Sequence, residues 1–137
     1  NVAWSQKNRS PMIRVPARRG IGTRCEVRMP DPSCNPYLAF SLMLAAGLKG
    51  VREGYELPAE ADANLFELDD KALGKLGIGQ LPQSLSEALH VMEHSELVHE
   101  ALGEHIFEWY VRNKRREWMD YKTHVSQFEI DRYLGTL

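Results

Sequence analysis

The chain has 137 residues, of which 43% are hydrophobic and 26% are charged, and its formal net charge is -2. This composition is typical of globular proteins and excludes the disordered and fibrous classes, while the length suits one domain or a piece of a larger one. The charge is unevenly distributed, because residues 1–28 contain seven Lys or Arg and a single acid, Glu26. A locally basic segment in a mildly acidic chain favours a compact anionic ligand over a nucleic-acid surface.

The cysteines and the apolar runs indicate the compartment. Cys25 and Cys34 are too few for a disulfide scaffold and lack CxxC spacing, so we expect a reduced, cytoplasmic protein. No signal-peptide pattern is present, and the longest apolar run, residues 37–48, is too short to span a membrane. The chain starts NVAWSQKNRS, without Met and without a start signal for a helix or strand, so we expect the interior of a longer polypeptide.

The first predicted strand covers residues 12–15. Pro11 and Pro16 flank it, and because proline cannot donate to a β-ladder, the pattern indicates a short strand or an edge strand. Residues 18–22, RRGIG, then predict a tight turn, since glycine reaches the positive φ angles that such turns require.

The second predicted strand covers residues 23–29, which alternate strictly between charged or polar and apolar side chains. Arg24, Glu26 and Arg28 share one face, and the cysteine, valine and methionine between and after them share the other. Such a strand is half-buried, and its charged face meets either water alone or a ligand. Both interpretations stay open on this pattern.

A helix is predicted from Pro36 to Val51. Asn35 is a good N-cap residue, and proline suits the first helical position. The helix is apolar nearly all round, which is typical of a helix buried on several sides, so we expect it to be the core helix. Its main apolar stripe consists of Tyr37, Phe40, Leu44, Leu48 and Val51.

The rest of the chain is predicted to be mainly helical. Residues 53–79 resemble an irregular surface loop with one short helix, and a capping box at Ser84 and Glu87 opens a helix that runs to about residue 94. A second start at Ser95 gives a helix over 96–102, which Gly103 ends.

Two further helices complete the prediction. The longer one covers residues 104–122, and a short one lies within 125–134. The predicted fold class is therefore α+β, with short antiparallel strands followed by a mainly helical C-terminal part. We divide it into active-site strands and turns, residues 1–34, and a helical part, residues 35–137.

Two other sites have less support from the sequence, a histidine pair and a basic run. His90 and His94 have the spacing of helical metal ligands, but no HExxH pattern accompanies them and they fall on a polar face. The basic run at 112–116 is typical of a solvated helix face, although nucleic-acid binding is the alternative. We expect neither a metal at the histidines nor a nucleic-acid partner.

The arginines around Glu26 form the main candidate site. Arginine offers a planar fork of donors that matches carboxylate and phosphate oxygens, and it stays charged at any working pH. A carboxylate among arginines can hold a divalent metal while the arginines hold anionic oxygens, an arrangement that suits phosphoryl transfer to a carboxylate. The arginines concerned are Arg9, Arg14, Arg18, Arg19, Arg24 and Arg28.

Three motifs in this region resemble a known family. N-R-S at residues 8–10, R-x-E-x-R at 24–28 and P-D-P-x-x-N-P-Y at 30–37 are together highly specific. They resemble the C-terminal part of the catalytic domain of bacterial type I glutamine synthetase. The resemblance continues through NLFEL, LPQSLSEAL and the tail, and so covers essentially the whole chain. A polyamine- or amine-accepting ligase of the same superfamily shares parts of the pattern and is the nearest alternative.

The resemblance implies a reaction and a role for each site residue. In this family ATP phosphorylates the γ-carboxylate of glutamate, ammonia then displaces phosphate to give glutamine, and Mg²⁺ or Mn²⁺ ions serve the site. By this resemblance Glu26 ligates the metal that coordinates the ATP phosphates, and Arg28 orients glutamate through its carboxylate. Arg9 is the catalytic arginine that holds the transferred phosphoryl group and the γ-glutamyl phosphate. Arg14 and Arg24 contact nucleotide phosphates.

Two positions depart from the family pattern. Ile21 stands where the resemblance implies a lysine that contacts nucleotide phosphate. Phe66, in NLFEL, stands where members regulated by adenylylation carry a tyrosine. Because phenylalanine has no hydroxyl to modify, we expect the unadenylylated, feedback-inhibited branch.

The resemblance also implies what surrounds the chain. The remaining metal ligands, the ammonia site and an N-terminal domain are expected upstream of Asn1, so we expect the isolated chain to be inactive. The alternative from another class is a non-catalytic module whose helices mediate assembly. The parent is expected to be a dodecamer of two hexameric rings, and residues 125–137 are expected to dock onto another subunit.

Overall fold

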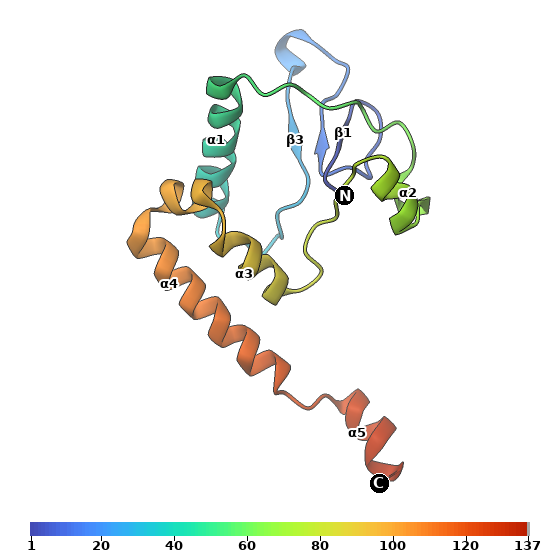
Figure 1. Ribbon diagram of the computed structural model, residues 1–137, viewed down its shortest axis with the longest axis vertical. Coiled ribbons are helices and arrows are strands. Elements are labelled where there is room, and N and C mark those ends of the chain that lie inside the picture. The colour runs from blue at the N-terminus through green and yellow to red at the C-terminus, as the bar shows by residue number, and fades with distance from the viewer. Residues whose placement is uncertain (137) are drawn as a thin grey trace. The chain divides into compact units, whose positions relative to one another are not determined.

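The computed structural model describes residues 1–136 of the chain (Figure 1). The chain divides into two units, Asn1–Leu81 and Pro82–Leu137, each with its own internal contacts. The division into site strands over 1–34 and a helical part over 35–137 stays a prediction.

A small three-stranded sheet organises the first unit. Its strands are β1 (Trp4–Ser5), β2 (Ile13–Arg14) and β3 (Glu26–Val27), in the order β1-β2-β3. The predicted strand at 12–15 is confirmed as β2, and the ladder of the predicted strand at 23–29 is confined to β3. The β2–β3 pair is antiparallel as predicted, whereas β1, which the pattern did not indicate, pairs with β2 in parallel.

The turn between β2 and β3 and the helix after β3 form where the local residues predict them. The RRGIG segment contains the 3₁₀ turn η1 (Gly20–Gly22), in which Gly20 has a φ of 75°. Helix α1 (Pro36–Glu53) begins after Asn35, whose side chain accepts a hydrogen bond from the backbone N–H of Tyr37 at 3.0 Å. The N-cap and the proline at the first helical position are thus confirmed.

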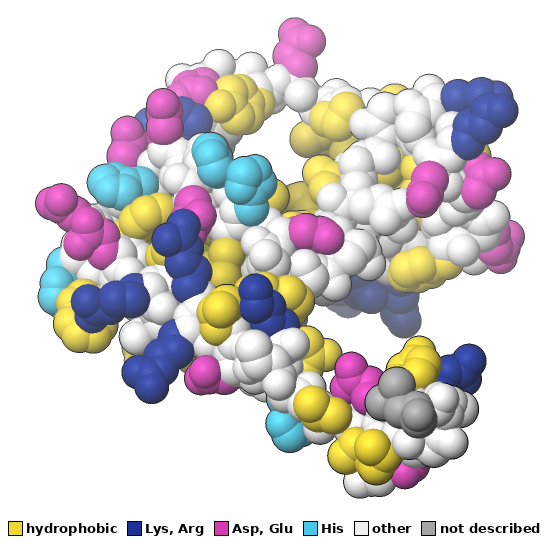
Figure 2. Space-filling model, turned by 60° about the horizontal axis from the view of Figure 1, so that its bottom comes forward, with side chains coloured by type: hydrophobic (Ala, Val, Ile, Leu, Met, Phe, Trp, Pro, Cys, Tyr) yellow, Lys and Arg dark blue, Asp and Glu magenta, His cyan; other side chains and the backbone are white. Residues whose placement is uncertain are grey.

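The prediction that α1 is a buried core helix is wrong for this structure. None of its residues is buried, and Tyr37 and Val51 are 82% and 80% exposed. Hydrophobic side chains are visible at the surface in Figure 2. A helix that is apolar all round can be buried, but burial also requires a partner surface. In this unit the core is built from other segments.

The core of the first unit comes from the segment after α1. Ala61, Leu65 and Leu73 are buried, and Ala3, Leu68 and Ile78 pack against them. This segment contains the 3₁₀ turn η2 (Leu65–Glu67) and helix α2 (Asp70–Lys75). It runs beside β1, since the N–H of Ala61 donates to the carbonyl of Trp4 at 3.0 Å. The prediction of one short helix in this segment is confirmed as α2. The prediction of a surface loop is wrong for the three buried residues, because these spaced apolar side chains cover strands that are too short to form a core alone.

We expect Leu65→Ala to lower the free energy of unfolding by about 2–5 kcal/mol, because Leu65 is only 2% exposed and its removal leaves a cavity. Phe66→Ala is the matched control, since Phe66 is adjacent and 77% exposed, and we expect its effect to stay within about 0.5 kcal/mol. Urea denaturation followed by circular dichroism measures both. Equal losses in the two variants would contradict this location of the core.

Caps define the helices of the second unit, α3 (Leu85–Glu93) and α4 (Glu96–Lys122). Ser84 and Ser95 accept hydrogen bonds from the backbone N–H groups of Glu87 and Val98, which confirms both predicted starts. Gly103, with a φ of 72°, interrupts α4 where the sequence predicted the end of a helix. The two helices pack together, and the buried side chains are Leu89, Leu102 and Val111.

The last helix, α5 (Gln127–Tyr133), continues into the 3₁₀ turn η3 (Leu134–Thr136). Ser126 and Glu129 form a complete capping box at its start. Its apolar side chains are exposed, for example Phe128 at 66%. Docking of residues 125–137 onto another subunit stays a prediction, and Leu137 lies outside the described residues. Within residues 1–136, no helix combines the length and apolar character needed to cross a bilayer.

Candidate active site

The β2–β3 pair brings three of the predicted site residues together. Its register sets Arg14 opposite Glu26, and Arg14 Nη1 lies 3.2 Å from Glu26 Oε2. Arg24, two residues before Glu26 on the same face, donates to Glu26 Oε1 from Nε at 3.0 Å and from Nη2 at 2.7 Å. Both carboxylate oxygens therefore face a guanidinium group, and the two arginines are held side by side by one acid.

The arginines set the ionisation state of Glu26. The hydrogen bond from Arg24 is the main cause that lowers the pKa of Glu26 below its ordinary value, against a smaller opposing effect of burial. The positive charges of Arg14, Arg24 and Arg28 lower this pKa further. Glu26 is thus an anion at neutral pH, and Arg28 lies close enough to act on it electrostatically.

One donor at this cluster has no acceptor. Arg14 Nε is buried and makes no hydrogen bond within residues 1–136, although the Arg14 side chain is 18% exposed. A buried N–H without an acceptor is unfavourable, and most such groups in proteins have a partner. Because Arg14 Nε is also inaccessible to solvent here, an oxygen could satisfy this donor only after the side chains of the cluster rearrange.

We expect Arg24→Ala to raise the pKa of Glu26, because this variant removes the hydrogen bond that lowers it most. A carboxyl whose pKa is lower in the folded state than in the unfolded state stabilises the fold at pH values above its unfolded pKa, near 4.5. This contribution disappears as the pH falls through the folded pKa. The variant should therefore lose less stability on acidification than the wild type.

NMR titration of the Glu26 carboxyl carbon, without added metal, measures this pKa. Arg19→Ala is the control, because the Arg19 guanidinium donates to the carbonyls of Pro16 and Arg18 rather than to Glu26. If Arg24→Ala left the Glu26 titration unchanged, the pairing described here would be wrong.

Arg9 and Arg28 lie outside this ion-paired group. Arg9 is exposed, and its side chain makes no hydrogen bond or ion pair with the residues that the structure describes. Arg28 follows β3, and its backbone N–H donates to the carbonyl of Met12 at 2.8 Å, which attaches it to β2. Arg28 is also exposed, and its guanidinium makes no hydrogen bond or ion pair within residues 1–136, so both side chains can reach a ligand, whereas those of Arg14 and Arg24 are paired with Glu26. Ile21, in the turn before β3, is fully exposed.

The cluster supplies one metal-ligating group. A carboxylate oxygen is the kind of ligand that Mg²⁺ and Mn²⁺ prefer. Within residues 1–136, however, no group of three or more His, Cys, Asp and Glu side chains is arranged to hold a metal ion. Glu26 therefore fits a metal site as a single ligand, provided that its bonds to Arg14 and Arg24 give way, and the other ligands must come from elsewhere.

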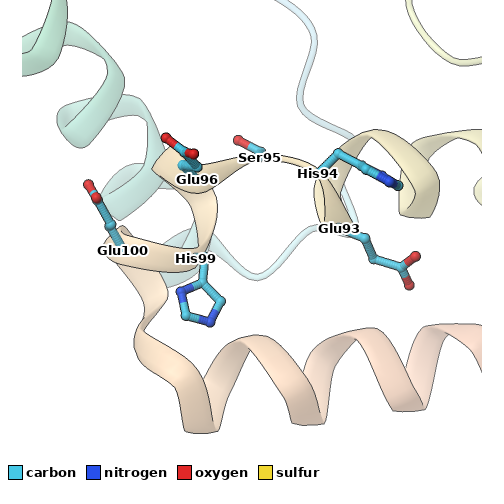
Figure 3. A pocket seen from close by; sticks show the side chains of 6 residues that line it. All are labelled: Glu93, His94, Ser95, Glu96, His99 and Glu100. Carbon is cyan, nitrogen blue, oxygen red and sulfur yellow. The ribbon is translucent and has the colours of Figure 1, made fainter.

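The histidine pair of the second unit does not form a comparable site. The rings of His90 and His94 lie 4.4 Å apart, and His94 Nδ1 shares a hydrogen bond with the carbonyl of His90 at 2.7 Å. Beside them is an open surface pocket of about 290 Å³, whose side chains do not converge on one point (Figure 3). It is lined by Glu93, His94, Ser95, Glu96, His99 and Glu100.

The basic run at 112–116 largely serves the helices themselves. Arg112 stacks over the ring of Trp109 at 3.6 Å, and Arg115 Nε lies 2.7 Å from Glu93 Oε1. Lys114 Nζ donates to Glu117 at 2.6 Å. These contacts agree with the interpretation as a helix face.

Sequence patterns missed the polar residues that hold the turn around Arg9. Some of them lie in β1 and in the turn itself, and their partners lie in the segment after α1, more than fifty positions further along the chain. No periodicity links them, and the N-R-S motif was the only local signal. The residues are Ser5, Gln6, Asn8, Ser10 and Glu60.

The chain matches the family described as "Glutamine synthetase, catalytic domain" over residues 1–133. The chain belongs to this family. The resemblance found in the sequence motifs is thereby confirmed at the level of the family, while the type I, unadenylylated subtype stays a prediction.

Curated relatives support the same family. The chain is 48% identical over 136 residues to a glutamine synthetase of Thermus thermophilus, and 49% identical over 136 residues to one of Methanosarcina mazei. Each match covers 99% of this chain and 30% of the relative. A glutamine synthetase of Mycobacterium tuberculosis is 47% identical over 137 residues, with 98% of this chain and 31% of the relative covered. The chain thus spans somewhat less than a third of these proteins.

A solved structure shares the fold. The structure titled "GmaS/ADP complex-Conformation 1" aligns with a TM-score of 0.82 and 30% sequence identity. The alignment covers 97% of this chain and 29% of that one. The α+β prediction, with a small sheet and a mainly helical remainder, is confirmed by this likeness and by the elements themselves.

Proposed function

We propose that the chain forms one wall of the active site of an ATP-dependent ligase that makes glutamine from glutamate and ammonia through γ-glutamyl phosphate. The observation that supports this most directly is the pairing of Glu26 with Arg14 and Arg24 on adjacent strands, in a chain of the glutamine synthetase family. The pairing combines an ionised carboxylate with arginines that match phosphate and carboxylate oxygens.

Each site residue has a role in this proposal. Arg14 and Arg24 contact nucleotide phosphates, and their position on both sides of the Glu26 carboxylate supports this assignment. Arg28 binds the carboxylate of glutamate, and Arg9 holds the phosphoryl group as it passes from ATP to glutamate. The side chains of Arg9 and Arg28 suit these contacts, because they are exposed and have no hydrogen-bond or ion-pair partner among the described residues. Nucleotide binding also has support from the structural relative, whose title names ADP.

Glu26 is proposed as one ligand of a Mg²⁺ or Mn²⁺ ion. When bound, such an ion neutralises phosphate charge and orients the nucleotide. The geometry adds a condition, since Glu26 must exchange its bonds with Arg14 and Arg24 for the metal. The same exchange would free both guanidinium groups for the phosphates, so that nucleotide and metal bind together.

The whole protein is proposed to be larger than this chain. Its curated relatives are about three times as long, and we propose that the remaining metal ligands and the ammonia site lie in the part that this chain does not match. We refer to this longer protein as the full-length enzyme. We further propose a cytoplasmic homo-oligomer of two hexameric rings. Because no group of three or more possible metal ligands lies together within residues 1–136, the isolated chain is expected to show no activity.

An acceptor assay tests the proposed function. The full-length enzyme is incubated with ATP, Mg²⁺ and glutamate, with ammonia or with a primary amine or polyamine, and the products are separated by mass. The proposal expects glutamine, with ammonia as the preferred acceptor. If a γ-glutamyl amide forms only from the larger amine, that amine replaces ammonia as the proposed acceptor. If glutamate gives no ATP-dependent product with any acceptor, the proposed function is wrong.

A further inference from the structure

Arg9 is exposed, whereas the residues on either side of it are held in place. Ser10 is 7% exposed, and the following Pro11 is fully buried. Asn8 Oδ1 accepts hydrogen bonds from the backbone N–H and the hydroxyl of Ser10, both at 2.9 Å. The residues on either side of Arg9 are therefore bonded to each other, which fixes the direction in which the Arg9 side chain leaves the backbone.

The segment after α1 anchors this turn from outside. Asn8 Nδ2 donates to the carbonyl of Ala63, and Ser10 Oγ accepts from the backbone N–H of Leu65 at 3.0 Å. Leu65 is itself buried in the core. The turn that carries Arg9 is thus attached at both ends to a core segment that is distant in sequence.

Glu60 extends the attachment to the backbone that enters the turn. Its Oε1 accepts from the backbone N–H of Gln6 at 2.6 Å and from the hydroxyl of Ser5 at 3.1 Å, and its Oε2 accepts from Gln6 Nε2 at 3.2 Å. Ser5 Oγ in turn accepts from the backbone N–H groups of Lys7 and Asn8, at 3.4 and 3.2 Å. A hydroxyl offers one donor and two acceptor positions, so that of Ser5, which is 1% exposed, is fully used.

The charge of Glu60 suits this role. Hydrogen bonds, first from the backbone N–H of Gln6 and then from the side chains of Ser5 and Gln6, lower the pKa of Glu60 below its ordinary value. The carboxylate is therefore ionised at neutral pH and acts purely as an acceptor, which matches the three donors around it.

We infer that Glu60 is a positioning residue for Arg9: through Ser5 and the backbone of residues 6–8 it holds the turn that presents the Arg9 guanidinium. This inference rests on the proposed role of Arg9 in phosphoryl transfer. Glu60 itself need not touch a substrate, because three donors of the protein already occupy its carboxylate oxygens. A shift of the guanidinium by about 1 Å would be enough to lower the rate of phosphoryl transfer.

A double-mutant cycle tests the inference in the full-length enzyme. Glu60→Ala should lower kcat by about ten- to a hundredfold, with smaller changes in the KM values for ATP and glutamate. In an Arg9→Ala background the same change should add little, because the group that Glu60 positions is already absent. Glu60→Gln should retain most of the activity, because its carbonyl can still accept from Gln6 and Ser5. Asp62→Ala is the matched control, since Asp62 is an exposed acid in the same segment.

The outcomes separate the two proposals. If Arg9→Ala lowers kcat and Glu60→Ala adds its full effect on top, the positioning role is wrong while the role of Arg9 stands. If Arg9→Ala keeps the wild-type kcat, the role of Arg9 is wrong and the inference fails with it. Thermal unfolding of each variant monitors folding. Should Glu60→Ala not fold, Ser5→Ala removes the bridging hydroxyl and must show the same non-additivity with Arg9→Ala, or the inference is wrong.

Discussion

Replacing Arg9 with alanine in the full-length enzyme should lower kcat for glutamine formation by roughly a hundred- to a thousandfold. Negative charge on the transferred phosphoryl oxygens needs fixed positive groups in the transition state, and an arginine at this point often contributes even more in other phosphoryl-transfer enzymes. Arg9 suits this task because its turn is anchored while its guanidinium has no partner within the described residues. Steady-state measurement of ATP- and glutamate-dependent glutamine formation gives the value.

Two further variants make the Arg9 result specific. Arg9→Lys keeps the charge but loses the planar fork of donors, so we expect it to recover only a part of the activity. Arg52→Ala removes an exposed arginine in the last turn of α1 and should leave kcat unchanged. If Arg9→Ala lowers kcat by less than about tenfold, Arg9 does not contact the transferred phosphoryl group, since a single transition-state donor contributes more than this.

Glu26→Ala should separate metal-dependent from metal-independent nucleotide binding. Loss of even an outer-shell partner of a metal ligand commonly costs about 10–100-fold in metal affinity, so removing a ligand should weaken ADP binding in Mg²⁺ by at least about tenfold. In the absence of metal, Glu26→Ala should instead strengthen ADP binding. Without Glu26 the guanidinium groups of Arg14 and Arg24 lose their internal partner, and both become available to the ADP phosphates.

Isothermal titration calorimetry with Mg²⁺ and with EDTA measures both affinities. Glu56→Ala is the control, because Glu56 is an exposed acid outside the site. An equal loss of affinity with and without metal would contradict the role of Glu26 as a metal ligand. It would indicate instead that Glu26 acts only by aligning the two arginines.

Local signals in the sequence were sufficient for the parts of the fold that depend on a few neighbouring residues. Asn35 and Pro36 predicted the start of α1, and Ser95 and Gly103 predicted a start and a break. The side chains of Asn35 and Ser95 each accept hydrogen bonds from backbone N–H groups within three positions, so the sequence contains both partners. Pro36 and Gly103 act through their own backbone angles, which are also a local property. The alternation around Glu26 likewise predicted that Arg24 shares its face.

Contacts between distant segments could not be predicted in this way. The parallel pairing of β1 with β2 and the bonds of Glu60 to Ser5 and Gln6 join residues that no periodicity relates. The burial of Leu65 and the exposure of α1 have the same origin, since burial depends on which surfaces meet. Hydrophobic pattern alone therefore misplaced the core.

The residue pattern alone predicted an anion-binding site with one metal ligand. Which anions bind, and which reaction they undergo, are proposed from the family. The alternating strand predicted that Arg24 shares the face of Glu26, and the pairing of β2 with β3 adds Arg14 to them. Nothing in the spacing of Arg9 and Arg28, however, distinguishes a phosphoryl-binding arginine from a carboxylate-binding one, because both ligands present similar oxygens. Their separate roles are proposals that follow from membership of the family.

The most direct test of these residue roles is a crystal structure of the full-length enzyme with ADP, Mg²⁺ and a phosphorylated analogue of glutamate. We predict that Glu26 has exchanged its arginine partners for a metal ion and that Arg14 and Arg24 contact the nucleotide phosphates. We also predict Arg9 within hydrogen-bond distance of the transferred phosphoryl group and Arg28 on the glutamate carboxylate. Nucleotide and analogue bound elsewhere, with Glu26 still paired to Arg14 and Arg24, would contradict the account.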